Sequence, residues 1–308
     1  MPIPPIPSDV HELLAGPWRV WVLPYGARLV QIWHRSTPLL LGFKDSSSYR
    51  SDRMSMGAVC GRYGNRIENA RLERDGIEYA LTANEGAQCL HGGQPGFGDQ
   101  TWTLDKVASD CITLTLTSPD GDQGFPGQCQ ARVTYRVSPQ GISCALSASV
   151  DKPCPINLIQ HNYWNLGADA GNHRLWIPAT QTQDTDSRNL PKPPRDVTAA
   201  DDFSSMRPIG HMNFDRNYCV PGQGIRPVAR LAGPYGELQV HSDQPHIQLY
   251  CAAGLKPTTA PLGVMHNPGA GVCLETQQMP NGPAMGQDVW IEPGQRYAHH
   301  IRWEFTPA

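Results

Sequence analysis

Cys111-Ile-Thr-Leu-Thr-Leu-Thr117 is the stretch that decides the fold class. Ile112, Leu114 and Leu116 alternate in it with threonines. Successive side chains of a β-strand point to opposite faces, so this segment has one apolar face and one hydroxyl face. Such alternation predicts a strand with one face on a core and the other near water.

Two further segments continue the same pattern. Gln130-Ala-Arg-Val-Thr-Tyr-Arg-Val137 and Ile142-Ser-Cys-Ala-Leu-Ser-Ala-Ser-Val150 alternate in the same way and are joined by Ser138-Pro-Gln-Gly141, a hairpin-like connection. The three segments predict an antiparallel meander. Trp18–Leu23 and Gly26–His34, separated by a turn at Pro24, predict another pair of strands.

Helices are expected to be few and short. No run of a dozen residues has apolar positions at helical spacing between a cap and a glycine. The 30 glycines and 29 prolines are spread between short strand-like segments, which suits many turns. The polar segment 181–202 predicts a long surface loop. We find no repeat and no domain boundary, so residues 1–308 are predicted to form a single all-β domain.

Composition limits the possible partners. The chain of 308 residues is 39% hydrophobic and 17% charged, and its net charge is -3, as in a globular protein with a large core. It has no basic block, so we expect neither a nucleic-acid nor a membrane partner, and no apolar run is long enough to cross a bilayer. A small neutral ligand, bound by a monomer or a homodimer, fits this composition better.

The cysteines predict a reducing compartment. Nine are present without a C-x-x-C pair or a close Cys/His cluster, so a structural zinc site is not expected. An odd number of cysteines, several inside strand-like segments, is typical of buried free thiols. The first residues carry no basic and apolar signal pattern, and the cytoplasm is the expected location.

Ile156-Asn-Leu-Ile-Gln-His-Asn-Tyr-Trp-Asn-Leu166 is the segment most suggestive of chemistry. It is predicted as a strand that delivers His161 into a pocket with Tyr163 and Trp164 as walls. Histidine can give and take a proton near neutral pH, because its pKa lies close to 7. Taken alone, the segment is explained better by a structural histidine packed beside aromatic rings, and only the other motifs of the chain favour a catalytic one.

Gly61-Arg-Tyr-Gly-Asn-Arg-Ile-Glu-Asn-Ala-Arg-Leu72 is a candidate binding loop that leads into a hairpin bending at Asp75-Gly76. Asn65 beside Arg66 offers donors and an acceptor for hydroxyl groups. A surface loop held by an ion pair is the alternative interpretation. His91 follows at a strand end before two glycines, where a plain turn would also place it.

Glu275 lies in an apolar strand-like segment, Gly271-Val-Cys-Leu-Glu-Thr-Gln277. A glutamate is rarely buried without a reason, and burial can tune its pKa toward that of a general base. Asp215 and Gln248 are further polar groups in aromatic or apolar settings. Either of them could instead cap a turn or stabilise a strand edge.

Taken together and in this order, several motifs resemble those of the aldose 1-epimerase (galactose mutarotase) family. The motifs are Leu23-Pro-Tyr-Gly-Ala-Arg-Leu-Val30, Leu41-Gly-Phe43, Gly61-Arg-Tyr-Gly-Asn-Arg-Ile67, Leu90-His-Gly-Gly93, Gln160-His-Asn-Tyr-Trp-Asn-Leu166, Gln248-Leu-Tyr250 and Leu274-Glu-Thr-Gln277. The resemblance spans nearly the whole chain and implies one large antiparallel β-sandwich of the galactose mutarotase-like supersandwich type, with a sugar on its concave face.

The resemblance also implies roles for particular residues. His161 matches the general acid of the family and Glu275 its general base. Asn65, Arg66, His91, Asp215 and Gln248 match positions that contact the sugar, and Tyr163 a pocket wall. The implied reaction interconverts the α and β anomers of an aldose: one group removes the proton of the anomeric hydroxyl while the other protonates the ring oxygen. It requires no metal or organic cofactor.

The chain also departs from the family pattern. Gln160 stands where Asn is usual, Trp164 where Phe is commoner, Phe214 where Tyr is usual, and Cys251-Ala-Ala-Gly254 where a polar pair and Asn often follow. Two alternatives therefore stay open. The first is an enzyme for a phosphorylated or acidic sugar, which needs basic groups at the pocket rim beyond Arg62 and Arg66, such as His211 with Arg216. The second is a carbohydrate-binding protein without turnover.

Overall fold

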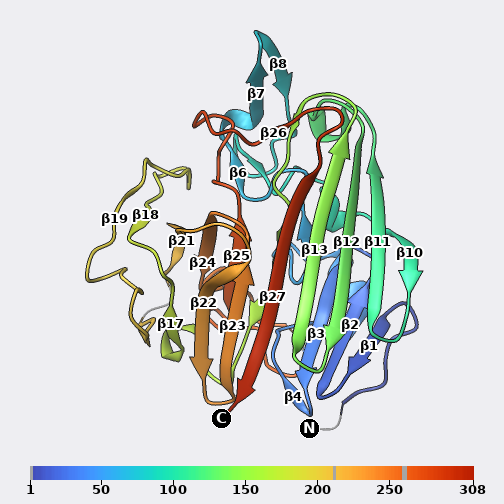
Figure 1. Cartoon of the computed structure of the whole chain (residues 1–308), viewed down its shortest axis with the longest axis vertical. Helices are drawn as coiled ribbons and strands as arrows, with labels where there is room; N and C mark the ends of the chain where they lie inside the picture. The colour runs from blue at the N-terminus through green and yellow to red at the C-terminus, as the bar shows by residue number, and fades with distance from the viewer. Residues whose placement is uncertain (1–2, 211–212, 259–261) are drawn as a thin grey trace.

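The largest β-sheet of the protein has nine strands (Figure 1). The computed structural model describes residues 3–210, 213–258 and 262–308. The spatial order of the sheet is β10 (Thr103–Val107), β11 (Cys111–Ser118), β12 (Cys129–Ser138), β13 (Gly141–Val150), β27 (Tyr297–Pro307), β23 (Gly236–Ser242), β22 (Arg226–Gly233), β17 (Arg174–Trp176) and β20 (Arg207–Pro208). The predicted antiparallel meander is confirmed as β11, β12 and β13, with Ile112 opposite Tyr135 and Val133 opposite Leu146.

One face of this sheet is turned to the core. Along β12, Ala131, Val133 and Tyr135 are buried, whereas Arg132 and Arg136 between and beyond them are exposed. Full burial of a side chain such as Val133 contributes roughly 1.5–3 kcal/mol relative to exposure. A slip of one residue would turn the apolar set to solvent, so the alternation read from the sequence also fixes the register.

A six-stranded sheet packs on the buried face of the first. Its order is β16 (Tyr163–Trp164), β25 (Val272–Gln277), β24 (His246–Tyr250), β21 (Asp215–Cys219), β18 (Gln181–Gln183) and β19 (Arg195–Asp196). The contacts that join the layers include a tryptophan pair and a hydrogen bond. The Trp164 and Trp303 ring centroids lie 5.9 Å apart, and Thr276 Oγ1 lies 2.8 Å from His299 Nε2. The predicted β-sandwich is thereby confirmed.

A four-stranded sheet of β1 (His11–Ala15), β2 (Trp18–Leu23), β3 (Arg28–His34) and β4 (Thr37–Pro38) extends the second layer. Here the predicted pair around Pro24 is confirmed, with Val20 opposite Ile32. Four short pairs complete the strands: β5 (Val59–Cys60) with β15 (Ile159–Gln160), β6 (Arg66–Ile67) with β9 (Cys89–Leu90), β7 (Arg71–Arg74) with β8 (Ile77–Ala80), and β14 (Cys154–Pro155) with β26 (Trp290–Ile291).

The helices are few and short, as expected. In residues 3–210, 213–258 and 262–308 they are the 3₁₀ turns η1 (Ser46–Arg50), η2 (Glu68–Ala70), η3 (Phe97–Asp99), η4 (Asp122–Gly124) and η5 (Ala170–Asn172). None of the helices in these ranges is long and apolar enough to cross a membrane. The nine cysteines are all free, and only Cys219 is not fully buried, which confirms the expected free thiols.

The prediction of one strand over residues 156–166 is wrong. The chain forms β15, which pairs with β5, and leaves this strand at His161 and Asn162. It then enters β16 of the six-stranded sheet. The backbone of His161 is bonded to the segment before β5: its N–H donates to the Ala58 carbonyl at 2.9 Å, and its carbonyl accepts from Gly57 N–H at 2.8 Å. This break between sheets displays the imidazole.

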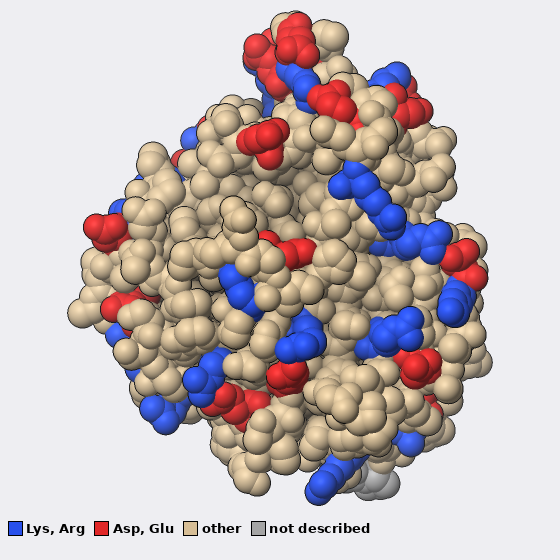
Figure 2. Space-filling model, viewed as in Figure 1, with Lys and Arg blue, Asp and Glu red and all other residues tan. Residues whose placement is uncertain are grey.

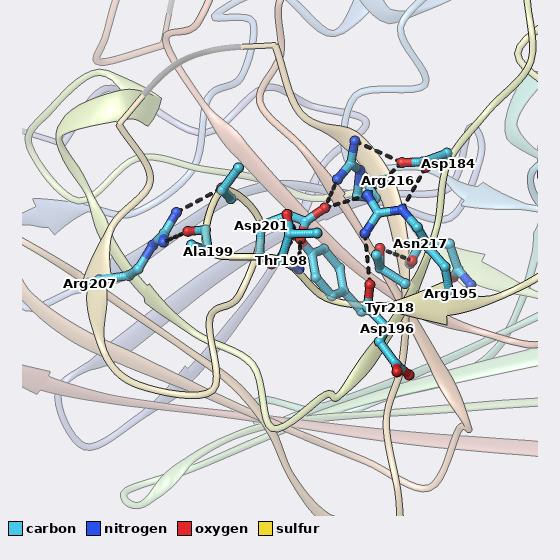
Figure 3. Close-up of polar contacts among 12 residues, drawn as sticks. Asp184, Arg195, Asp196, Thr198, Ala199, Asp201, Arg207, Arg216, Asn217 and Tyr218 are labelled. Carbon is cyan, nitrogen blue, oxygen red and sulfur yellow. Dashed lines mark hydrogen bonds and ion pairs between the residues drawn. The ribbon is translucent and has the colours of Figure 1, made fainter.

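The segment 181–202 is only partly the loop that was predicted. Its first three residues are β18, inside the sheet, and β19 pairs with them. The remainder is tied down by charges: Arg195 donates to Asp184 at 2.6 Å and to Asp201 at 2.5 Å. Arg216 of β21 pairs with the same two carboxylates (Figure 3). We call Asp184, Arg195, Asp201 and Arg216 the ion cluster.

Candidate active site

The outer face of the six-stranded sheet carries polar side chains in register. Residues opposite one another in antiparallel strands have their side chains on the same face. One row across β18, β21, β24 and β25 consists of Gln183, Asn217, Gln248 and Glu275. The next row consists of Asp215, Tyr250, Cys273 and Tyr163. Strand pairing therefore brings together residues that lie far apart in the sequence.

A cavity of about 230 Å³ lies over these rows. It is lined by Arg53, Met54, Ser55, Asn65, Arg66, Glu85, Leu90, His91, His161, Tyr163, Asp215, Gln248, Tyr250 and Glu275. Every residue that the sequence singled out as catalytic or sugar-binding is among them. The strands of the sheet form its floor, and the segments around η1, β6 and β9 form its rim.

His161 and Glu275 face each other in this cavity. His161 Nε2 lies 3.6 Å from Glu275 Oε1, and both side chains are almost fully buried. The imidazole stacks on Tyr163 with ring centroids 5.1 Å apart. Tyr163 in turn donates its hydroxyl to the Met54 carbonyl at 2.9 Å, which fixes the stacking ring. The pair is thus held close, at slightly more than hydrogen-bond length.

Burial sets the protonation of this pair. It lowers the pKa of His161 to about 4, from 6.5, because the imidazolium would lose its hydration. It raises the pKa of Glu275 well above the usual 4.5, and the nearby Asp215 carboxylate adds to this while Arg66 partly opposes it. Both shifts favour the uncharged forms of the two groups.

His91 and Asn65 bind each other across the rim. Asn65 N–H donates to His91 Nδ1 at 3.1 Å, and His91 N–H donates to the Asn65 carbonyl at 3.0 Å. Both residues have φ near +60° (63° and 53°), a strained region for residues other than glycine that is enriched at functional sites. Since Nδ1 accepts, the ring proton is on Nε2. Burial holds the pKa of His91 well below 6.5.

Arg66 satisfies both interpretations of its loop. It forms a two-pronged ion pair with Glu85, at 2.6 and 2.8 Å, and it also lines the cavity. On the sheet, Gln248 Nε2 donates to Asp215 Oδ1 at 2.6 Å, while Asp215 itself is exposed. The cavity therefore combines fixed donors and acceptors from several elements, which is what a ligand rich in hydroxyl groups requires.

Two residues considered from the sequence lie elsewhere. Trp164 points into the core toward Trp303, because its neighbour Tyr163 takes the cavity side of β16. Arg62 is buried and donates to the carbonyls of Pro126 and Gly127 at 3.0 and 2.8 Å. Its role is structural, and the expectation that it lies at the rim is wrong.

Two further basic residues were considered for a phosphate site. Arg216 is engaged in the ion cluster and does not line the cavity. His211 lies outside the described residues.

Several lining residues escaped the sequence analysis. Tyr250 follows Gln248 by two positions on β24, so period-two alternation could have placed it on the same face. Arg53, Met54, Ser55 and Glu85 come from irregular segments, where no periodicity indicates a direction. They reach the cavity only through the tertiary fold.

His161, Cys273 and Glu275 are three residue types that can bind a metal, and their ligand atoms lie within 4.8 Å of one another. The thiol is 3.8 Å from Nδ1, whereas the carboxylate faces Nε2, so the two groups lie at different nitrogens of the ring. Burial also raises the pKa of Cys273 well above 9, and a thiol must lose its proton to bind a metal. The arrangement suits proton transfer better than metal binding.

Several known proteins are similar to this chain in sequence and in fold. The aldose 1-epimerase family model matches residues 13–304. A galactose mutarotase of Sus scrofa is 32% identical over 97% of this chain and 94% of its own. An aldose 1-epimerase of Escherichia coli strain K12 is 30% identical over 86% and 84%. The crystal structure of an aldose epimerase homologue from C. elegans superposes with a TM-score of 0.91 at 25% identity, covering 97% of this chain and 99% of that one. The chain belongs to the aldose 1-epimerase family.

Proposed function

We propose that the protein interconverts the α and β anomers of a neutral aldopyranose. The observation that carries the proposal is the buried pair of His161 and Glu275, 3.6 Å apart in a cavity walled by hydroxyl-binding groups. Mutarotation needs one group to take a proton from the anomeric hydroxyl and a second to protonate the ring oxygen. A carboxylate and an imidazole meet this need.

Between them, Glu275 and His161 need to hold only one exchangeable proton to complete the reaction. Glu275 as carboxylate with His161 as imidazolium carries the same number of protons as the neutral pair. Opening the ring moves a proton from the sugar to Glu275 and another from His161 to the ring oxygen, which leaves both groups neutral. Rotation about the C1–C2 bond then presents the other face of the aldehyde to the ring hydroxyl. Ring closure reverses both proton transfers and gives the other anomer.

The pKa shifts support this cycle. Burial favours the neutral pair, with the pKa of Glu275 raised and that of His161 lowered. The neutral pair is the form that accompanies the open-chain aldehyde. The cost of the cycle therefore lies in forming the charged pair beside the closed sugar, and the ring-opening step that follows discharges both groups, which the buried environment favours.

A neutral sugar fits the charges of the cavity better than a phosphorylated or acidic one. Its charged lining groups are two arginines, Arg53 and Arg66, and three acidic residues, Glu85, Asp215 and Glu275. Arg66 is neutralised by Glu85. A phosphate would thus meet one cation, Arg53, that has no ion-pair partner among the described residues, together with the Asp215 carboxylate. Binding without turnover would not need an acid and a base so close together.

The decisive experiment follows anomer exchange directly. Freshly dissolved α-anomers of glucose, galactose, xylose and glucose 6-phosphate are mixed with trace protein, and polarimetry or one-dimensional NMR exchange records the approach to equilibrium. We expect acceleration for the neutral sugars, with glucose 6-phosphate the poorest. Binding of a sugar without acceleration of any would support the non-catalytic alternative.

The compartment is also a proposal. Nine free thiols support a reducing environment such as the cytoplasm, where disulfides rarely persist.

On the face drawn in Figure 2, acidic and basic side chains are interspersed, which suits a small neutral ligand rather than a polyanion.

A further inference from the structure

Gln277 is a buried residue of β25 that does not line the cavity but donates a hydrogen bond to Gln248, which does. It lies two residues beyond Glu275 on the same strand face and is fully buried. Its Nε2 donates to Asn217 Oδ1 at 3.2 Å and to Gln248 Oε1 at 3.4 Å. Its own Oε1 is buried with no hydrogen-bond partner among the described residues. A buried amide kept at this cost calls for an explanation.

The bond from Gln277 fits only one orientation of the Gln248 amide. Because Gln277 presents an N–H group to it, Oε1 of Gln248 turns toward Gln277 and Nε2 toward Asp215. With the amide reversed, Oε1 would face the Asp215 carboxylate, and two acceptors would meet without a proton. The 2.6 Å bond from Gln248 to Asp215 and the donor supplied by Gln277 therefore require the same orientation of the Gln248 amide.

We propose that Gln277 is a positioning residue for sugar recognition, which fixes the Gln248 amide and through it the Asp215 carboxylate that distinguishes epimeric hydroxyls. The proposal rests on the proposed function, since Asp215 and Gln248 are taken to contact the sugar. It assigns Gln277 no contact with the substrate.

The same polarity continues away from the cavity. Asn217, whose Oδ1 accepts from Gln277, donates its Nδ2 to Gln183 Oε1 at 2.6 Å. Gln183 donates to the Lys192 carbonyl at 2.9 Å. Asn217 and Gln183 thus each accept on one side and donate on the other, whereas Gln277 donates at the head of the chain. Reversing one of the three amides would leave two acceptors in contact. We call Gln277, Asn217 and Gln183 the amide chain.

The amide chain ends on the loop that the ion cluster holds. Arg216 and Tyr218, which alternate with Asn217 along β21, bind Asp201 through its side chain and its carbonyl (Figure 3). Both faces of β21 are therefore fixed, one by the amide chain and one by the loop. Asp215, the first residue of this strand, is held on a rigid support, as precise recognition requires.

The test is a double-mutant cycle between Gln277→Leu and Asp215→Ala. For each protein, kcat/KM is measured with glucose and its C2, C3 and C4 epimers. We expect Gln277→Leu to reduce the largest epimer preference about 3–10-fold, the size of one neutral hydrogen bond, with a higher KM and little change in kcat. In the Asp215→Ala background, the same substitution should change no preference, because the carboxylate that it positions is gone.

Gln278→Leu is the matched control. Gln278 is the next residue of the chain, and its Nε2 donates to Gln244 Oε1 at 2.8 Å, outside the cavity. This variant should keep every epimer preference. A pH profile unchanged by Gln277→Leu would separate positioning from an effect on the acid–base pair.

Three results would overturn the inference: an equal loss on every sugar, an effect of Gln277→Leu that persists without Asp215, or the same loss in Gln278→Leu. If the unaltered protein accelerates no sugar, the proposed function fails separately. The epimer preferences of the same variants are then read from sugar affinities by calorimetry, with the same outcomes deciding the positioning role.

Discussion

His161 and Glu275 show, at the scale of single residues, how burial prepares two ordinary side chains for proton transfer. We expect His161→Ala and Glu275→Gln each to lower kcat about 10²–10⁴-fold, the usual contribution of a general acid or base. The double variant should lose far less than the product of the two effects, since both act on one transition state. Polarimetry with a fixed sugar measures the rates.

A thermal melt supplies the control for these variants. Burial disfavours the charged Glu275, so Glu275→Gln removes a costly group and should not lower the melting temperature. Near-normal turnover of a folded Glu275→Gln variant would show that the carboxyl is not the base.

The pH profile of kcat/KM gives a second prediction. The active pair holds one exchangeable proton, so activity falls when it gains a second or loses the first. Because burial lowers the pKa of His161 to about 4, we expect the acid limb near pH 4 rather than 6.5. The raised pKa of Glu275 moves the alkaline limb upward. An acid limb centred at 6.5 would mean that the histidine is hydrated in the working enzyme.

Asp215 is predicted to read sugar stereochemistry. It is exposed, and its contact among the described residues is the bond from Gln248, so Asp215→Ala should change the melting temperature little. The substitution should cost about 1–3 kcal/mol in kcat/KM for sugars with a hydroxyl group that donates to the Asp215 carboxylate, because that donor is left unpaired. Kinetics with epimeric hexoses decide the point. A uniform loss together with a lowered melt would identify Asp215 as a structural residue.

The sequence identified these residues through type and company rather than through geometry. Glu275 stood out because a carboxylate in an apolar strand needs a reason, and His161 because aromatic residues surround it. Arg62 was misplaced for a physical reason: guanidinium groups serve equally well to bind a ligand and to satisfy buried carbonyls. Only the fold decides which acceptors lie within reach.

At the scale of elements, Arg62 joins the end of β11 to the start of β12. It donates to the carbonyls of Ser118, Pro126 and Gly127 and to the Ser118 hydroxyl. We expect Arg62→Met to destabilise the protein by roughly 3–5 kcal/mol, because it leaves buried acceptors unpaired. Urea titration measures this, with exposed Arg296→Met as the control.

The same variant separates a structural from a binding role for Arg62. Folded Arg62→Met protein should keep its KM for sugar, since the guanidinium lies outside the cavity. Unchanged stability with a raised KM would instead return Arg62 to the sugar site.

Regular strands were predictable and broken ones were not. The limits of β11, β12 and β13 follow from alternation to within one residue, because each strand has one face on the core and one at the surface. Residues 156–166 are buried on all sides, so hydrophobicity does not mark where the chain leaves one sheet for the other. That break, at His161, is where the close approach of His161 to Glu275 arises.

For the whole molecule, the cysteines provide a probe of global opening. Eight of the nine thiols are buried, and burial raises the pKa even of the half-buried Cys219. We expect a thiol reagent at pH 8 to modify Cys219 first, and the other eight only upon unfolding. Mass spectrometry with time tests this.

The same labelling experiment bears on domain organisation. A single cooperative domain, as the sequence predicts for residues 1–308, releases the eight buried thiols together at one rate. Two separate rates, divided by position along the chain, would reveal two folding units.

The position of β27 has a consequence for how the protein is made. This strand lies in the middle of the nine-stranded sheet, between β13 and β23, yet both partners precede it in the chain. Val150, the end of β13, leaves the ribosome on the order of ten seconds before Tyr297 at roughly 5–20 residues per second. During that interval β13 has an open, apolar edge that another chain could join. We therefore expect nascent chains to need protection of this edge, by a chaperone or by spacing along the polysome, until the central strand arrives.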